Sequence, residues 1–318
     1  EGGAHTRVPP VALTALSRAG VTTAVGLLGT DTTTRTLHDL LACARGLEHF
    51  GLTALCYTGG YDVPPPTLTG SVRGDLVHVD RMVAVGELAL SDHRSSQPTF
   101  DELVRIAADA HVAGMMTGKA GLVHLHLGDG PRGLSMVRRA VRETELPART
   151  FHPTHCNRNP ALWQEALDAA ASGLWVDVSA FPYAEGDGTV AAWDAVAGYL
   201  RAGLDPEHLT VSSDAGGCLP EFDADGRLLH MGVGDAGGLL DTVRRAIAAG
   251  VAPELALAAV TRNPARLFRF AGKGELVAGA DADLVAVDAG WSVRRVWARG
   301  RPLVVDGAPV ERGWFEAR

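Results

Sequence analysis

The sequence predicts an α/β protein: a (β/α)8 barrel of the TIM type with a small β-appendage at its C-terminus. Seven short apolar runs rich in β-branched residues alternate with amphipathic segments, and each run ends in a polar residue. Apolar strands that alternate with helices indicate a parallel sheet covered on both faces. Seven such runs favour a closed barrel over an open sheet, although eight strands close this type of barrel.

The elements follow in order along the chain. The first helix is expected in PPVALTALSRAG, where proline stands near the first turn and Gly20 at the end. A strand in VTTAVGLLGT and a helix in HDLLACARGLEHF come next. The remaining strands are expected in LTALCYTGGY, MVAVGELAL, LVHLHLGD, TFHPTH, LWVDVSA and LTVSSD.

The pattern changes after Asp214. We expect a long loop, CLPEFDADGRLLHMGVGDAG, and then two helical patterns that reach about Arg269. The tail contains short alternating strands and turn dipeptides, which predict a small β-appendage. Residues 1–270 are therefore predicted to form the barrel, and residues 271–318 the C-terminal segment of a small β-domain.

Composition excludes several classes of function. The net charge is −8 and no basic block offsets it, which argues against binding to nucleic acid or to an anionic membrane surface. No run of about 18 apolar residues predicts a transmembrane helix. The four cysteines show no CxxC pairing, so we expect the reduced thiols of a cytoplasmic protein, although four cysteines could also pair.

Four polar residues at strand ends could bind one metal centre: Glu87, His126, His155 and Asp214. Each has another interpretation when it is taken alone. The histidines could be a hydrogen-bonded barrel residue and a turn residue, Glu87 could pair with Arg94, and an Asp before Gly is usually a turn former. Parallel strands gather such residues at one mouth of the barrel, however, and imidazole is the commonest zinc ligand.

Glu, His, His and Asp at the ends of the fourth, fifth, sixth and eighth barrel strands resemble the amidohydrolase superfamily, which comprises metal-dependent hydrolases. In detail the chain is similar to the isoaspartyl dipeptidases, also called β-aspartyl dipeptidases. The segments that carry this resemblance are EGG, GLLGTD, YTGGYDVP, LTGSV, LSDHRS, PTHCNRN, LTVSSDAGG and the tail GKGELVAGADADLV.

The resemblance implies a zinc site. Glu87 would bridge two zinc ions in place of the carboxylated lysine common in relatives. His126 and His155 would bind one ion, and Asp214 would bind the other. The resemblance also implies that a zinc-activated hydroxide attacks the β-aspartyl amide, while Asp214 acts as general base and then general acid.

Other positions resemble substrate contacts in this family. Arg94 and Arg158 offer planar forks suited to the two carboxylates of a small dipeptide, although both could instead form ion pairs on the barrel rim. Glu1 resembles the acidic residue that receives the substrate α-ammonium group. Tyr61 resembles the phenol that binds the developing oxyanion, and Thr30 matches a substrate-contacting position.

The chain departs from the family in two places. Cys218 stands where relatives tend to carry serine, and a thiol is a weaker hydrogen-bond donor. The superfamily's His-x-His pair ends the first barrel strand, just ahead of the segment that resembles EGG. We therefore expect that strand and its pair upstream of Glu1. Two zinc ions per subunit are expected if the pair exists, and at least one otherwise.

The resemblance also implies a homo-oligomer that hydrolyses β-aspartyl dipeptides. Two alternatives remain at this point. The protein could be another amidohydrolase that acts on cyclic amides or N-acyl amino acids, or an inactive barrel used as a binding scaffold. Arg94 and Arg158 together with Tyr61 argue against the first alternative, because a cyclic or monocarboxylate substrate needs fewer cationic side chains to bind it. The four retained candidate ligands argue against the second.

Overall fold

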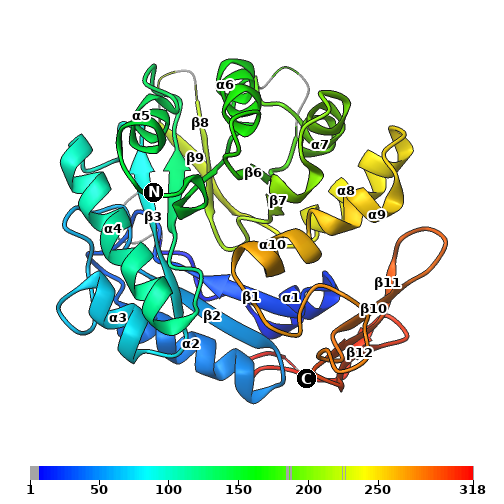
Figure 1. Cartoon of the computed structure of the whole chain (residues 1–318). Coiled ribbons are helices and arrows are strands. Elements are labelled where there is room, and N and C mark those ends of the chain that lie inside the picture. Colours follow the sequence, from blue (N-terminus) through cyan, green and yellow to red (C-terminus); the bar gives the residue numbers. More distant parts are fainter. Residues whose placement is uncertain (1–6, 184–185, 187, 224, 226, 318) are drawn as a thin grey trace.

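Parallel strands of the barrel type form the centre of the structure (Figure 1). The computed structural model describes residues 7–183, 186, 188–223, 225 and 227–317. Within them, the seven predicted strands are all present and parallel to their neighbours. Their bounds are β1 Thr23–Gly26, β2 Thr53–Thr58, β3 Met82–Leu90, β4 Val123–Leu127, β5 Phe151–Thr154, β6 Val176–Ser179 and β7 Leu209–Ser212.

The strands follow one another in sequence order, as a barrel requires. β1 to β5 form one curled sheet, and β6 pairs with β7. The amide of Cys156, just after β5, donates to the carbonyl of Asp177 on β6 (3.2 Å), so the two sheets meet edge to edge. This order brings the carboxyl ends of all the strands to one mouth, and the predicted α/β barrel architecture is confirmed.

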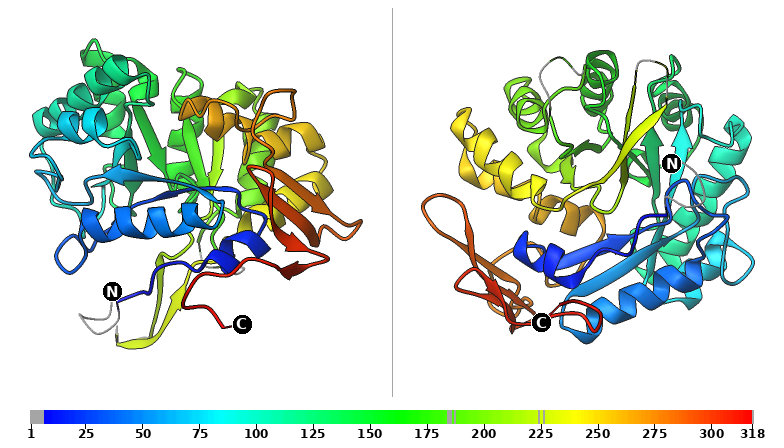
Figure 2. Two further views of the ribbon diagram at one scale, coloured as in Figure 1. Left: turned by 90° about the horizontal axis from the view of Figure 1, so that it is seen from below. Right: turned by 180° about the vertical axis from the view of Figure 1, so that it is seen from behind.

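Helices lie outside the strands, around β1 to β7 (Figure 2). They are α1 Leu13–Arg18, α2 Leu37–His49, α3 Val72–His78, α4 Phe100–Thr117, α5 Ser135–Glu143, α6 Pro160–Ala170, α7 Ala192–Arg201, α8 Gly238–Ala248, α9 Pro253–Ala258 and α10 Arg262–Leu267. Two short 3₁₀ helices, η2 and η3, span Ala148–Thr150 and Pro206–His208. None of the described helices is long and apolar enough to cross a membrane.

Local sequence signals fix where several helices begin and end. Thr99 and Glu102 form a reciprocal capping box at the start of α4, and Gly118 ends the helix in the left-handed region (φ 77°). Asn159 caps α6, which has Pro160 in its first turn. Such caps satisfy amides that the helix itself leaves without a partner.

The segment after Asp214 differs from the prediction. We expected a long loop, but β8 (Cys218–Phe222) and β9 (Leu228–Val233) form an antiparallel hairpin that extends out of the barrel (Figure 2). The helical region that follows contains α8, α9 and α10 instead of the two expected helical patterns. α9 and α10 have six residues each, fewer than two helical turns. The spacing of apolar residues in such short helices is hard to distinguish from a continuation of the neighbouring helix.

The C-terminal tail forms the predicted small β-region. Its antiparallel strands, in the spatial order β10-β11-β12-β13, span Leu284–Val287, Val293–Ala298, Arg301–Val305 and Ala308–Pro309. Val296, Ala298, Leu303 and Val304 from this sheet are buried with Leu13 and Leu16 of α1. The packing of β11 and β12 against α1 therefore attaches the sheet to the start of the described chain.

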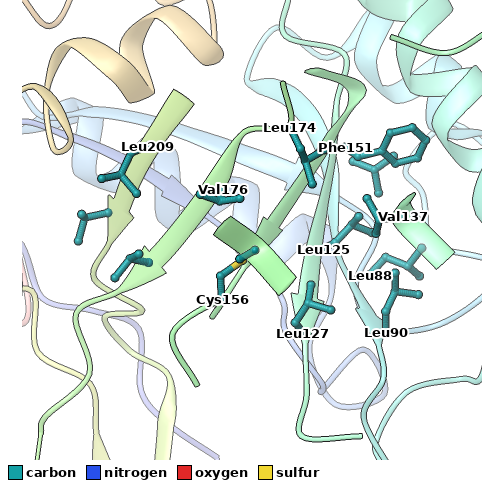
Figure 3. Close-up of a cluster of buried hydrophobic side chains, with 14 of the residues drawn as sticks. Leu88, Leu90, Leu125, Leu127, Val137, Phe151, Cys156, Leu174, Val176 and Leu209 are labelled. Carbon is teal, nitrogen blue, oxygen red and sulfur yellow. The ribbon is translucent and has the colours of Figure 1, made fainter. Parts of the chain in front are cut away.

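The main core lies between the outer face of the sheet and the helices. Leu88 and Leu90 on β3 pair in register with Leu125 and Leu127 on β4, and all four side chains are buried (Figure 3). Because side chains alternate across a strand, these leucines face the helices and leave the intervening residues to face the barrel interior. The polar side chains that alternate with these leucines along β3 and β4 therefore point into the barrel.

Candidate metal centre and active site

Glu87, His126 and His155 meet inside the mouth of the barrel. Their possible ligand atoms all lie within 4.8 Å of one another, and all three residues are buried. Nε2 of His155 is 3.2 Å from Oε1 of Glu87, and Nδ1 of His126 is 3.6 Å from Oε2. Two ligand atoms about 2.0–2.2 Å from a tetrahedral zinc ion lie about 3.3–3.6 Å apart. The spacing and chemistry of this cluster fit a divalent metal ion.

Strand alternation places two members of this cluster. His126 lies between Leu125 and Leu127 and pairs in register with Ala89 of β3, two residues beyond Glu87. Because the leucines face the helices, His126 and Glu87 point inward. A carboxylate in such a buried strand is costly unless it is paired or binds a cation. The carboxylate of Glu87 lies beside the two histidines, whereas Arg94 pairs with Asp92.

His155 and Asp214 share an unusual backbone conformation. Both follow the carboxyl end of a strand and lie in the left-handed region, with φ of 60° and 49°. This region costs about 1–3 kcal/mol for a residue with a Cβ, and such residues cluster at functional sites. The Arg158 amide donates to the His155 carbonyl (2.9 Å), and the Gly217 amide donates to that of Asp214 (3.0 Å). These turns hold the two residues at the mouth.

Each histidine of the cluster has a partner that orients its ring. Nε2 of His126 is 2.8 Å from Oδ2 of Asp92, and Nδ1 of His155 is 2.7 Å from the Ser179 hydroxyl. An ionised carboxylate only accepts, so Nε2 of His126 carries a proton, and in the neutral ring Nδ1 then offers the lone pair that a metal ion needs. Partners of this kind fix the tautomer of metal-binding histidines.

Neither Asp92 nor Ser179 was predicted from the sequence. Asp92 lies in the LSDHRS segment, where only Arg94 was singled out. The available signal was a carboxylate just past the end of β3, at the edge where the strand ends converge. Ser179 gave no comparable signal, because serine at a strand end is common and its contact with His155 joins residues 24 positions apart.

Electrostatics inside the cluster favour a bound cation. Burial would raise the pKa of Glu87, but hydrogen bonds from His126 and His155 hold it well below its usual value. Burial would lower the pKa of His126, but hydrogen bonds to Asp92 and Glu87 raise it above its usual value. The metal-free site thus keeps an ionised carboxylate beside an imidazole that takes up a proton, and a metal ion can replace that proton.

Asp214 lies near the cluster, but it does not belong to the set of donors within 4.8 Å of one another. Burial raises the pKa of its carboxyl, the charge of Glu87 raises it further, and His155 opposes the shift. The charge of Glu87 can shift the pKa of Asp214 only if the two carboxylates lie close together. The Asp214 carboxyl therefore lies within electrostatic range of the cluster.

Tyr61 and Arg158 border the cluster. The Tyr61 hydroxyl is 2.6 Å from Nδ1 of His126, and burial raises the pKa of this phenol, so the hydroxyl remains a donor. Arg158 donates from Nε to the carbonyl of Leu127 (2.9 Å), and its guanidinium lies 5.6 Å from the centre of the Phe181 ring. Its charge also influences the pKa values of His126 and Asp214.

The other predicted substrate contacts lie in different parts of the structure. Arg94 forms two hydrogen bonds to Asp92, from Nε (3.0 Å) and from one terminal nitrogen (2.7 Å). The Gly29 carbonyl accepts from the Tyr61 amide (3.2 Å), which brings the loop that contains Thr30 beside Tyr61. Cys218 begins β8, is half-buried and is a free thiol. Glu1 lies outside the described residues.

A second buried polar layer lies beneath the cluster. Nδ1 of His124 is 2.9 Å from Nδ1 of His152, and Nε2 of His152 is 3.0 Å from the Thr210 hydroxyl. Thr210 donates in turn to Asp177 (2.5 Å). Burial lowers the pKa of both histidines, so this layer adds neutral imidazoles below the site. It supports the barrel interior under Glu87.

The chain is similar to known amidohydrolases in sequence and in structure. A family profile described as the amidohydrolase family matches residues 10–303. A crystal structure of β-aspartyl dipeptidase from Fervidobacterium islandicum AW-1, in complex with a β-Asp-Leu dipeptide, superposes with a TM-score of 0.91. It is 40% identical over 98% of this chain and 82% of its own. A second structure of that enzyme gives a TM-score of 0.88 and 38% identity, over 98% and 80% of the two chains.

A curated relative is more distant. Adenine deaminase 2 from Jannaschia sp. (strain CCS1) is 34% identical over 148 residues, which amount to 45% of this chain. The matched stretch spans 20% of the length of that deaminase.

Proposed function

This chain belongs to the amidohydrolase family and, within it, to the β-aspartyl dipeptidases; we propose that it is a metal-dependent enzyme that hydrolyses the β-aspartyl bond of dipeptides. The observation that carries the proposal is the convergence of three buried donors, Glu87, His126 and His155, at the mouth of the barrel. The 40% identity to an enzyme solved with β-Asp-Leu supports this substrate class.

We propose Zn²⁺ as the metal, held by Glu87, His126 and His155. Two imidazoles and a carboxylate at near-tetrahedral spacing suit zinc. When bound, such an ion lowers the pKa of a coordinated water towards neutrality and polarises a carbonyl group. The residues around it then determine where protons and substrate go.

Asp214 is the proposed proton carrier. Its raised pKa makes the carboxyl a better base than an ordinary aspartate. In this role it takes a proton from the attacking water and passes it to the leaving amine. The left-handed turn at Asp214 holds the carboxylate at the mouth during both transfers.

The remaining side chains are proposed to bind the dipeptide. Arg158 and Arg94 would hold its carboxylates, and Tyr61 would donate to the carbonyl oxygen as negative charge develops on it. Arg94 must then share its guanidinium with Asp92, which already accepts two of its hydrogen bonds. We retain Thr30, Cys218 and Glu1 as further proposed contacts, the last for the substrate ammonium group.

The test compares two isomeric substrates. Purified protein is analysed for metal and assayed with β-Asp-Leu and α-Asp-Leu, before and after chelation and re-addition of zinc. We expect hydrolysis of β-Asp-Leu that chelation removes and zinc restores, with α-Asp-Leu cleaved far more slowly. Equal rates on both dipeptides, or turnover that chelation leaves unchanged, would contradict the proposal.

The cellular location and the oligomeric state of the protein are also proposed. The four cysteines form no disulfide in the described part of the chain, and we propose a cytoplasmic location in which they stay reduced. We also propose a homo-oligomer, which sedimentation velocity would test. A monomer at micromolar concentration would contradict it.

A further inference from the structure

A cavity of about 170 Å³ lies between the end of β6 and the helices α7 and α8. Phe181, Tyr183 and Trp193 contribute aromatic rings to its wall, and Asp235, Asp241 and Arg245 contribute charges. The volume is many times the roughly 10–15 Å³ that a cavity needs to hold one water. The cavity opens at the carboxyl ends of the strands, the same face as the proposed active site.

Phe181 connects this cavity to the metal cluster. Its ring stacks on that of His155, with centroids 5.2 Å apart and planes 27° apart. The Arg158 guanidinium lies over the same ring, 5.6 Å from its centre. The Phe181 ring is therefore one wall of the cavity and also contacts His155 of the cluster and Arg158, the proposed carboxylate-binding arginine. A dipeptide bound at the cluster would have the cavity beside it.

The chemistry of the cavity favours a cation. The protein's own Arg245 lies over Trp193, 4.3 Å from the ring centre, and donates from Nε to Asp241 at 2.7 Å. Tyr183 stands edge-on to Trp193, with centroids 5.4 Å apart. A guanidinium on an aromatic face beside a carboxylate is a favourable arrangement, and it shows what the walls can accommodate.

The charges of the cavity leave a place for a second cation. Its charged lining, counted over the described residues, consists of the carboxylates of Asp235 and Asp241 and the guanidinium of Arg245. Asp235 is exposed, and its Oδ1 accepts a hydrogen bond from the Gly237 amide (3.0 Å). Asp241 forms ion pairs with Arg245 (2.7 Å) and Arg244 (2.6 Å), whereas no cation in the described lining pairs with Asp235.

We propose that this cavity binds the side chain of the second residue of the dipeptide and favours a cationic one, such as lysine. The inference rests on the proposed function, because it assumes that a β-aspartyl dipeptide occupies the site. The aspartyl half of such substrates is constant, and the second side chain is the part that varies. The aromatic rings and the carboxylate of Asp235 would select among dipeptides that differ in this second side chain.

Matched substrates test this selection. β-Asp-Lys and β-Asp-norleucine have the same carbon chain and differ in the terminal ammonium group. We expect wild-type kcat/KM to be roughly three- to thirtyfold higher for β-Asp-Lys. Asp235→Asn keeps the acceptor for Gly237 and should lower this preference about two- to fivefold. Trp193→Leu should lower it as well, through loss of the aromatic face.

The controls separate the possible failures. Asp168→Asn removes an exposed carboxylate on α6, outside the cavity, and should leave the preference unchanged. Thermal melting shows that each variant is folded. Equal efficiency on both dipeptides, or a preference that Asp235→Asn and Trp193→Leu both leave intact, overturns the inference alone. Failure of wild type to hydrolyse either dipeptide overturns the proposed function and the inference with it.

Discussion

Replacing Asp92 with asparagine should weaken metal binding, although Asp92 is not one of the proposed ligands. Oδ2 of Asp92 accepts the Nε2 proton of His126 at 2.8 Å, and both side chains are 4% exposed. This bond fixes the tautomer that leaves Nδ1 available to a metal, and it raises the basicity of the ring. Asparagine has the same shape but a neutral acceptor, so the bond weakens without leaving a cavity.

The magnitude follows from the burial of this pair. Buried hydrogen bonds to charged groups contribute about 1.5–3 kcal/mol, and asparagine retains part of that. Loss of a partner of this kind typically lowers metal affinity by about 10- to 100-fold, which equals about 1.4–2.7 kcal/mol. The change also lowers the pKa of His126, which reduces proton competition. We therefore expect the full loss of affinity near about pH 8, where competition is small.

The assay is competition for zinc between the metal-free protein and a chelator of known affinity. Asp109→Asn is the matched control, because it removes an exposed carboxylate that also pairs with an arginine, Arg73. An affinity for Asp92→Asn within twofold of wild type, at equal thermal stability, would refute the reasoning. Equal weakening by Asp109→Asn would show that the effect is one of overall charge.

Three further predictions concern the substrate, the protons and the fold. Arg158→Met should abolish hydrolysis of β-Asp-Leu and leave zinc content unchanged; loss of zinc would mean that the arginine is structural. Zinc affinity should fall as pH drops through the raised pKa of His126, by about tenfold per unit for each proton displaced, and a flat profile in chelator competition would contradict this. Gly121→Ala should destabilise the fold by about 2–4 kcal/mol in urea unfolding, because its Cβ would meet Cα of Gly114 at 2.5 Å. Gly118→Ala, which meets nothing within 4 Å, should cost far less than Gly121→Ala, and equal losses would refute the packing argument.

The parallel strands could be predicted because they are buried on both faces. A strand such as MVAVGELAL is a continuous apolar run, and every residue of β3 is buried. The hairpin of β8 and β9 lacked this signal. Leu229 and Val233 are exposed, and none of the β8 and β9 side chains that the structure describes is buried, so these residues show no buried face whose alternation the sequence could reveal.

The candidate ligands could be singled out because strand ends converge in a barrel, whatever their separation along the chain. The residues that hydrogen-bond to the histidines of the barrel interior could not be predicted in this way. Ser179 meets His155 from the next strand, and Thr210 meets Asp177 and His152 across the interior. Serine and threonine are common at such positions, and only the register of the strands decides which of them reaches a histidine. Register is a property of the assembled sheet and not of one segment.

The central claim is that Glu87, His126 and His155 hold a catalytic metal ion. Anomalous diffraction at the zinc absorption edge, from crystals of zinc-loaded protein, tests this most directly. We predict a peak about 2.0–2.2 Å from Nδ1 of His126, Nε2 of His155 and a carboxylate oxygen of Glu87. A zinc-loaded crystal with no peak between these three residues, or with its peak at other ligands, would contradict the account.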